Sequence, residues 1–232
     1  MDSIYKIHKL IDFITDIVKK PCAVAGNSLG GFTALYAAAS IENKDQTLIN
    51  GVALLNAAGR FKNPDDELIL KEEVPQWRQN IAAFIQRFII RLSFIITKQP
   101  LRIEQVLKQV YPINQDNVDD ELVESIQFPA QDPNAAEVFY RVVSKNGNGP
   151  SIYVDDLLND LIDFNKKKGR VLPLLLLWGE SDPWIRPAAA DKIQAIYPDS
   201  KRVSINAGHC PMDEAPHEVN QALNNFLQIV HS

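Results

Sequence analysis

The feature that most constrains this chain is a short turn, Gly26-Asn27-Ser28-Leu29-Gly30, which lies between an apolar stretch and an alanine-rich one. Residues 22–25 predict a buried strand, and the stretch after the turn predicts a helix that runs to Ser40. A serine in the pattern G-x-S-x-G, between a strand and a helix, sits on a strained turn that lifts its hydroxyl out of the sheet. The backbone N–H of Leu29 would then point at a developing oxyanion. The alternative is an ordinary turn in which Ser28 only caps the helix.

A serine nucleophile needs a histidine base, and in this kind of site the histidine comes last in the chain, after the acid. His8 precedes the turn, His217 begins the last predicted helix, and His231 lies in the tail. His209 directly follows the last predicted strand, where a base could reach Ser28. We therefore predict that His209 takes the serine proton and returns it to the leaving alcohol. The alternative is an ordinary loop histidine.

The orienting acid is expected in the turn Trp178-Gly179-Glu180-Ser181-Asp182-Pro183, which follows a run of four leucines. Asp182 lies beyond the end of that predicted strand and is our choice for the acid. Glu180 lies nearer the strand and is the second choice. The alternatives are a turn residue for Asp182 and a solvated carboxylate for Glu180. Asp213 and Glu214 are expected to be solvated loop charges or helix-start residues.

The pattern of apolar segments predicts an α/β fold with a parallel sheet. Three further strands are expected, followed by a terminal helix over 216–230; the strands are at 51–55, 172–177 and 202–205. Between them the sequence predicts a series of helices, near 76–97, 101–110, 118–127, 134–145 and 151–164. We therefore predict a core formed by residues 1–59 and 169–232, and a helical lid formed by residues 60–168. Such a lid would lie over the carboxyl ends of the strands, where ligands bind in these folds.

Charge and cysteine content exclude several other functions. The formal net charge of -5 argues against general nucleic-acid binding, which needs a basic surface. Two cysteines, Cys22 and Cys210, provide neither a disulfide framework nor metal-ligand spacing, and we expect free thiols. The histidines form no H-x-x-x-H pair, so no metal site is expected. No uninterrupted apolar run reaches the roughly 20 residues that cross a bilayer.

Several motifs together resemble one family. They are Gly26 to Gly31, Leu54-Leu55-Asn56, 107–111, 117–120, Trp178 to Trp184, and Ala207-Gly208-His209-Cys210-Pro211. Over nearly the whole chain this pattern resembles the α/β-hydrolases of chlorophyll breakdown, the chlorophyll dephytylases and pheophytinases of plants and cyanobacteria. The resemblance implies an α/β-hydrolase fold with a lid, a Ser28–Asp182–His209 triad and no cofactor. It also implies a small lipophilic ester as substrate, the phytyl ester of chlorophyll or pheophytin, and a location in the cytoplasm or beside a thylakoid membrane.

One predicted lid helix, residues 81–96, is apolar around most of its circumference. Arg87 and Arg91 leave only a narrow polar stripe, and residues 76–111 carry six basic side chains against Glu104 alone. A basic, apolar helix suits the surface of an anionic membrane. The alternative is a lid helix buried against the core with its arginines in water.

The start of the chain departs from the family pattern, because only 27 residues precede Ser28. We expect a fold without the N-terminal strands of the sheet, in which strand 22–25 is an exposed edge. The loop that donates the second oxyanion N–H would be missing with them, and losing one donor costs about 10²–10³ in rate. A downstream start site or a truncated gene would explain this, and predicts a poorly soluble or nearly inactive chain. The alternatives are a non-catalytic remnant, or a lipase, thioesterase or acyltransferase of the same fold.

Overall fold

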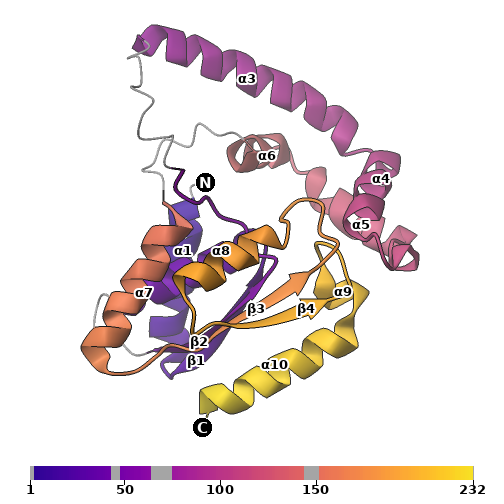
Figure 1. The fold of residues 1–232 in the computed structure, drawn as a ribbon. Helices are drawn as coiled ribbons and strands as arrows, with labels where there is room; N and C mark the ends of the chain where they lie inside the picture. Colours follow the sequence, from indigo (N-terminus) through magenta and orange to yellow (C-terminus); the bar gives the residue numbers. More distant parts are fainter. Residues whose placement is uncertain (1–2, 43–47, 64–74, 144–151, 232) are drawn as a thin grey trace. The chain divides into compact units, whose positions relative to one another are not determined.

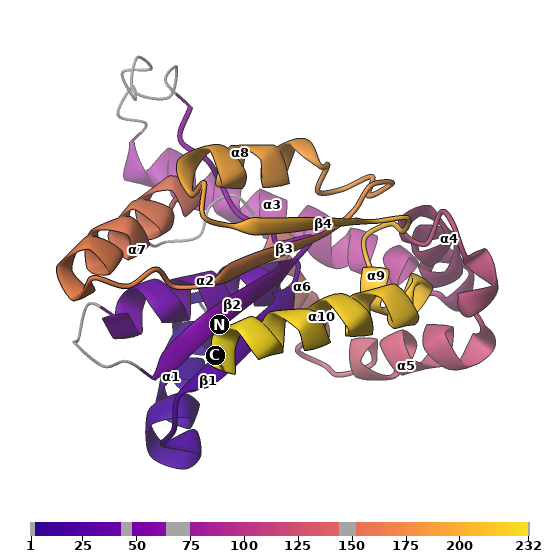
Figure 2. The same ribbon diagram turned by 60° about the horizontal axis from the view of Figure 1, so that its bottom comes forward.

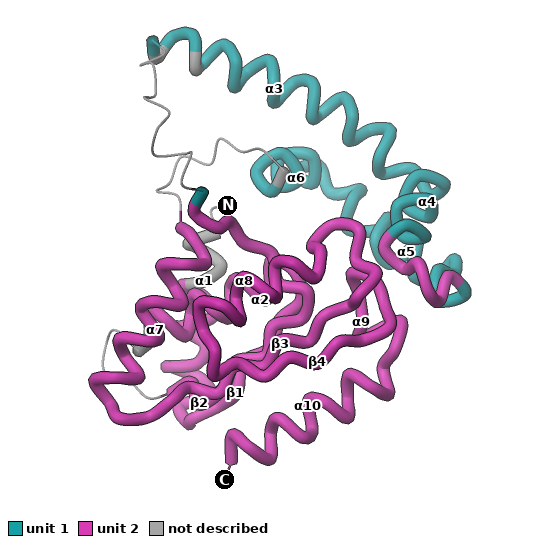
Figure 3. The backbone as a smooth tube through the Cα atoms, viewed as in Figure 1, with its two compact units in different colours: residues 1–2, 63–109, 116–150 teal, residues 3–62, 110–115, 151–232 magenta. Residues whose placement is uncertain are grey.

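The computed structural model describes residues 3–42, 48–63, 75–143 and 152–231. The chain divides into two compact units, which Figure 3 shows in different colours. Unit 1 comprises residues 1–2, 63–109 and 116–150, and unit 2 comprises residues 3–62, 110–115 and 151–232.

Unit 2 contains a parallel sheet of four strands in the order β1-β2-β3-β4 (Figure 1). The strands are β1 (Cys22–Asn27), β2 (Ile49–Leu55), β3 (Leu174–Gly179) and β4 (Lys201–Ile205). All four predicted strands are therefore present. β3 begins two residues later than expected, because Pro173 has no N–H to donate to the ladder, although its carbonyl accepts from Val52 N at 3.0 Å. As expected, β1 is an edge strand, and Ala25 on it is exposed.

The two faces of the sheet carry separate apolar clusters, because side chains alternate along each strand. In β2 and β3, Val52, Leu54, Leu174 and Leu176 pack with helices α2, α7 and α8, whereas Ala53, Leu55, Leu175 and Leu177 pack against α10. Figure 2 shows α10 along one face of the sheet. Burial on both faces explains why residues 51–55 of β2 and 174–178 of β3 are continuously apolar.

Among the residues that the structure describes, seven helical segments of unit 2 accompany these strands. They are α1 (Ser3–Asp12), the π-helix η1 (Phe13–Val18), α2 (Leu29–Glu42), α7 (Val154–Lys168), α8 (Ala188–Ile196), α9 (Pro211–Glu214) and α10 (Pro216–His231). Helix α1 continues directly into η1, which ends where Lys19 takes a φ of 54° and donates to Ile14 O at 2.9 Å. Helix α8 was not predicted; Pro187 directly before it is a helix-start signal.

The regular elements in the described residues of unit 1 are helices. They are α3 (Gln76–Thr97), α4 (Pro100–Val110), the 3₁₀ turn η3 (Gln115–Asn117), α5 (Asp120–Ala130) and α6 (Ala135–Val143). α3 packs against α6 through Phe94 and Phe139, whose ring centroids are 5.3 Å apart. Arg87 adds an ion pair with Glu137 at 2.7 Å.

The boundary between the units differs from the predicted one at residue 168. Helix α7 was predicted as part of the lid, but it belongs to unit 2, where Leu158 and Leu161 are fully buried in the core cluster. The segment 110–115 also belongs to unit 2. Helical periodicity shows that a segment has an apolar face, but it does not show which partner covers that face. Whether unit 1 acts as a lid stays a prediction.

Candidate active site

The turn after β1 has the backbone geometry of a strained elbow. Ser28 has a φ of 52°, a left-handed conformation that costs a residue with a Cβ about 1–3 kcal/mol. Three backbone hydrogen bonds hold it there: Ser28 N donates to Leu55 O at 3.0 Å, and Ser28 O accepts from Phe32 N at 3.2 Å and Ala58 N at 2.9 Å. The serine is thus fixed to the last residue of β2, to the loop that follows it and to the first turn of α2.

Two glycines of the elbow are required by close packing, and a third is not. A Cβ on Gly26 would lie 2.2 Å from the carbonyl carbon of Gly30, and one on Gly31 would lie 2.7 Å from Ala57 Cβ. A Cβ on Gly30 would meet nothing within 4 Å. Packing therefore does not require a glycine at position 30, although the G-x-S-x-G pattern includes one. Backbone approaches backbone at Gly26 and Gly31, whereas Gly30 faces open space.

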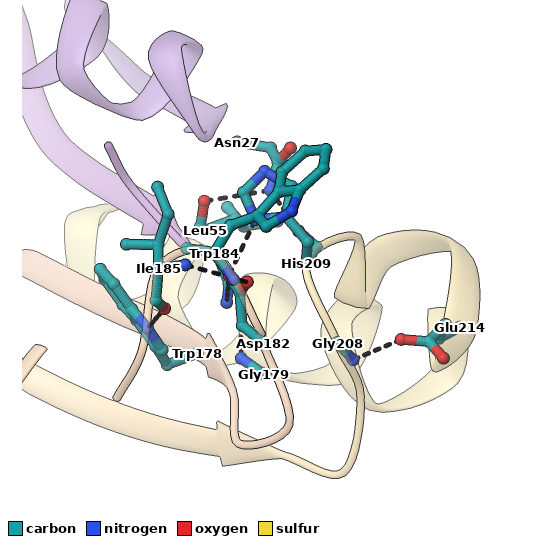
Figure 4. Close-up of polar contacts among 11 residues, drawn as sticks. Asn27, Leu55, Trp178, Gly179, Asp182, Trp184, Ile185, Gly208, His209 and Glu214 are labelled. Atoms are coloured by element: carbon teal, nitrogen blue, oxygen red, sulfur yellow. Dashed lines mark hydrogen bonds and ion pairs between the residues drawn. The ribbon is translucent and has the colours of Figure 1, made fainter. Parts of the chain in front are cut away.

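Asp182 is buried at the carboxyl end of β3 with a full set of hydrogen-bond donors (Figure 4). Its Oδ1 accepts from the backbone N–H groups of Trp184 at 2.7 Å and Ile185 at 3.0 Å. Its Oδ2 accepts from Asn56 Nδ2 at 2.7 Å and lies 2.8 Å from Nδ1 of His209. These four contacts use all the acceptor positions of an ionised carboxylate.

The hydrogen bonds to Asp182 favour its ionised form. Burial alone would raise the pKa of Asp182, but the hydrogen bonds from His209, Ile185 and Trp184 outweigh it and lower the pKa below its usual value. Asp182 is therefore an ionised acceptor at neutral pH, and Nδ1 of His209 carries the hydrogen between them. In the neutral imidazole, the other ring nitrogen, Nε2, then carries no proton and can accept one.

A side-chain amide connects the elbow to the histidine loop. Asn27, the residue before Ser28, donates from Nδ2 to His209 O at 2.9 Å and to Leu55 O at 3.2 Å. Between the described residues, the Ser28 hydroxyl makes no hydrogen bond to His209 in this structure. In enzymes of this kind the hydrogen bond between nucleophile and base often tightens only when a substrate is bound. The link through Asn27 nevertheless holds the elbow beside the loop of His209. The indole of Trp184 packs on the His209 ring with centroids 5.0 Å apart (Figure 4).

The rival candidates lie elsewhere. All four histidines are among the described residues, and only His209 is buried; His8, His217 and His231 are exposed. Glu180, the second choice for the acid, is exposed, and its carboxylate contacts no hydrogen-bond partner among the described residues. The structure thus brings together Asp182 and His209, in preference to any other predicted pair.

Glu214 corrects one expectation. It was predicted as a solvated loop charge or a helix-start residue, and it does lie in the short helix α9. It is not solvated, however: its exposed fraction is 7%, and it accepts backbone hydrogen bonds from Ile113, Asn114 and Gly208. Its neighbour Asp213 is exposed as predicted, although it accepts from Tyr111 OH at 2.6 Å. Helix position alone cannot distinguish the two carboxylates, because two of the three donors to Glu214, Ile113 and Asn114, lie about 100 positions earlier.

Asn56 is the other residue whose part in the site the sequence did not reveal. It is fully buried, has a φ of 41°, and accepts from Gly179 N at 3.0 Å while donating to Asp182. A polar residue directly after the continuously apolar run of β2 was the available signal. Asn56 fixes the distance between the ends of β2 and β3.

Leu29 is the first residue of α2, and its N–H donates to no acceptor in the part of the chain that the structure describes. Free N–H groups at a helix start favour an anion.

The described residues contain no group of His, Cys, Asp and Glu that could hold a metal ion. Both cysteines are free, and burial raises the pKa of the Cys210 thiol. A groove of about 970 Å³ runs along β4 and α10, and none of Ser28, Asp182 and His209 lines it.

The sequence matches a known family and a known relative. The sequence model described as the Alpha/beta hydrolase family matches residues 2–222. The chain is 33% identical over 227 residues to the chloroplastic pheophytinase of Arabidopsis thaliana. The matched region covers 95% of this chain but only 44% of that protein. The chain thus spans less than half the length of this relative.

Solved structures match the fold. A membrane phospholipase A described as a bacterial virulence factor has a TM-score of 0.68 at 21% identity, covering 100% of this chain and 64% of that one. A meta-cleavage product hydrolase from Pseudomonas fluorescens has a TM-score of 0.67 at 14% identity, covering 98% of this chain and 72% of that one. At these identities the likeness concerns the fold, and it confirms the predicted fold class.

Proposed function

Because the chain belongs to the alpha/beta hydrolase family, we propose that it is a serine ester hydrolase with Ser28, Asp182 and His209 as its triad. The observation that carries this proposal is the buried Asp182–His209 pair, tied through Asn27 to the strained turn that bears Ser28. A structural ion pair would not need a left-handed serine beside it.

The proposed reaction follows from the protonation of the pair. His209 Nε2 removes the proton of Ser28 as Oγ bonds to the acyl carbon, and Asp182 stabilises the resulting imidazolium. The carbonyl oxygen becomes an oxyanion, for which the N–H of Leu29 is the proposed first donor. The bond to the alcohol breaks as His209 protonates the departing oxygen. Water, deprotonated by His209, then releases the acid and restores Ser28.

The test compares wild type with Ser28→Ala on a short-chain p-nitrophenyl ester. We expect kcat to fall by about 10³-fold or more, because the nucleophile is lost while binding is kept. Ser204→Ala, which removes an exposed hydroxyl from β4, is the matched control and should keep full activity. A fluorophosphonate should label wild type at Ser28 alone. A wild type that neither turns over the ester nor takes the label would contradict the proposal and favour a non-catalytic remnant.

For the substrate, we propose a long-chain isoprenoid ester, the phytyl ester of a chlorophyll pigment. The 33% identity to a chloroplastic pheophytinase supports this, as does the apolar surface of α3 described below, and it favours a location in a plastid or beside a photosynthetic membrane. Pheophytin a, chlorophyll a and a triacylglycerol should be compared in detergent, with release of phytol or fatty acid as the readout. Faster hydrolysis of the triacylglycerol would favour a lipase instead.

Helix α3 supports a lipid partner. Nine large apolar side chains on it stand between 51% and 73% exposed: Trp77, Ile81, Phe84, Ile85, Phe88, Ile89, Leu92, Ile95 and Ile96. Projected at about 100° per residue, they fall within one arc of about 140°. Phe94, on the opposite side, is buried against α6, and Arg87 pairs with Glu137 there. Packing within unit 1 therefore leaves the apolar arc without cover.

We propose that this arc lies on the surface of an anionic membrane. By length and composition, Asn80–Thr97 is also long and apolar enough to cross a membrane. This was not predicted from the sequence, because arginines interrupt the apolar run. A surface position fits better, because Arg87 and Arg91 lie mid-helix, and the ion pair of Arg87 with Glu137 would be costly in hydrocarbon. The basic excess of residues 76–111 complements anionic headgroups.

Vesicle flotation tests this surface. Wild type should bind vesicles of phosphatidylcholine with phosphatidylglycerol more tightly than phosphatidylcholine alone, and Phe88→Asp with Leu92→Asp should abolish binding. The matched control is Val138→Asp with Val142→Asp, two exposed apolar residues at the same spacing on α6. Equal binding to both vesicle types would remove the electrostatic argument. No binding, with self-association that depends on concentration, would assign the arc to a second copy.

A further inference from the structure

The buried carboxylate of Glu214 is not used by the proposed chemistry, yet it lies against the loop that carries His209. Glu214 ends the short helix α9, five residues after His209. One of its oxygens, Oε1, accepts from the backbone N–H groups of Ile113 and Asn114, both at 2.9 Å. The other, Oε2, accepts from the N–H of Gly208, the residue directly before His209. A single side chain thus joins two separate backbone segments.

The second segment holds His209 from the other side as well. His209 N donates to Val110 O at 2.9 Å, and Tyr111 OH donates to Asp213 Oδ2 at 2.6 Å. Burial and this hydrogen bond raise the pKa of Tyr111, so its hydroxyl stays a donor. The backbones are in close contact: a Cβ on Gly208 would lie 2.4 Å from Val110 O. Val110 and Tyr111, which contact the loop that carries His209, therefore have little freedom to move.

The charge of Glu214 adds to the strength of the arrangement. An ionised acceptor makes hydrogen bonds about twice as strong as a neutral one, and three backbone donors here point at one carboxylate. An amide in its place could accept at one end only, because its NH₂ group would face an N–H group at the other. The arrangement therefore selects for a carboxylate, and not just for a side chain of that size.

We infer that Glu214 is a positioning residue for His209: by fixing segment 110–115 against Gly208, it sets where the imidazole stands between Asp182 and Ser28. Segment 110–115 belongs to unit 2 but is flanked in the sequence by unit 1 on both sides. This inference rests on the proposed ester hydrolysis, in which His209 is the base and its position therefore affects the rate.

The first test measures kcat and KM for Glu214→Gln and Glu214→Ala on the short-chain ester. We expect kcat to fall by about 10- to 100-fold, the range for small misplacements of reacting groups, with KM changed less than about threefold. The matched control is Glu218→Gln, which removes the same charge from an exposed position on α10 and should change neither constant. Variants that fold and keep kcat within twofold of this control would overturn the inference, as would a rise in KM alone.

A second measurement separates this inference from the proposed function. The low-field proton NMR signal of His209 Nδ1–H reports its hydrogen bond to Asp182 without any turnover. It should be present in wild type and Glu218→Gln, and shifted or lost in Glu214→Gln at a temperature where far-ultraviolet circular dichroism shows that variant folded. A wild type without esterase activity would refute the proposed function, while an unchanged proton signal in Glu214→Gln would refute the positioning role.

Discussion

Around Asp182 four donors surround one buried carboxylate, whereas along α3 nine large apolar side chains stand exposed within their unit. Both regions invert the usual rule of apolar inside and polar outside, and they do so for different reasons. A buried charge is tolerated only when every lone pair is used, so the first region specifies one geometry. An exposed apolar arc specifies no partner by itself and gains stability only when something covers it.

The largest expected effect comes from the first region. Asp182→Asn keeps the volume of the side chain but offers an NH₂ or a neutral oxygen to His209, which favours the wrong tautomer. We expect kcat for ester hydrolysis to fall by about 10⁴-fold, with the fold intact by circular dichroism. Steady-state kinetics checks this. A loss below tenfold would mean that Asp182 is structural only, and would weaken the contrast with α3.

A pair of apolar truncations tests whether α3 is part of the folding core. Leu158→Ala, in a fully buried position of α7, should lower the free energy of unfolding by about 2–5 kcal/mol. Phe88→Ser, in the exposed arc, should change it by less than about 0.5 kcal/mol. Chemical denaturation followed by circular dichroism measures both. A large loss for Phe88→Ser would show that the arc is buried in solution.

Asn56→Ala should have an intermediate effect, because it leaves one Asp182 lone pair and the Gly179 N–H without partners. We expect a loss of about 1–3 kcal/mol in the free energy of unfolding, and a fall in kcat of about tenfold. The control is Asn50→Ala, which removes a half-buried asparagine side chain from the start of β2, at the opposite end of the strand from Asn56. Equal kcat values for the two variants would count against a role for Asn56 in orienting the acid.

The smallest effect is a pH dependence of stability. The pKa of Asp182 is lowered in the folded state, so its contribution to stability is present above the unfolded value of about 3.9 and is lost as the pH falls through that value toward the folded one. The difference in melting temperature between wild type and Asp182→Asn should therefore shrink below about pH 4. Thermal scans between pH 6 and 3 check this; a constant difference would exclude ionisation as its source.

Much of the site could be predicted because its chemistry follows strand ends. A serine, an acid and a histidine each follow an apolar run, and the carboxyl ends of parallel strands meet at one edge of a sheet. The prediction of Asp182 over Glu180 used the same reasoning, and the burial of Asp182 agrees with it. Helix α7 shows the limit, because its periodicity was recognised but its partner was assigned to the wrong unit.

By itself, the sequence determined the parallel α/β core, the strained elbow at Ser28 and the order of the candidate triad, because local patterns of apolar and turn residues encode all three. Only the tertiary structure decided which polar groups are buried together. Asn56, Glu214 and segment 110–115 find their partners across 100 residues or more. Such partners leave no periodic signal, since the need to satisfy a buried carboxylate arises only once the chain has folded around it.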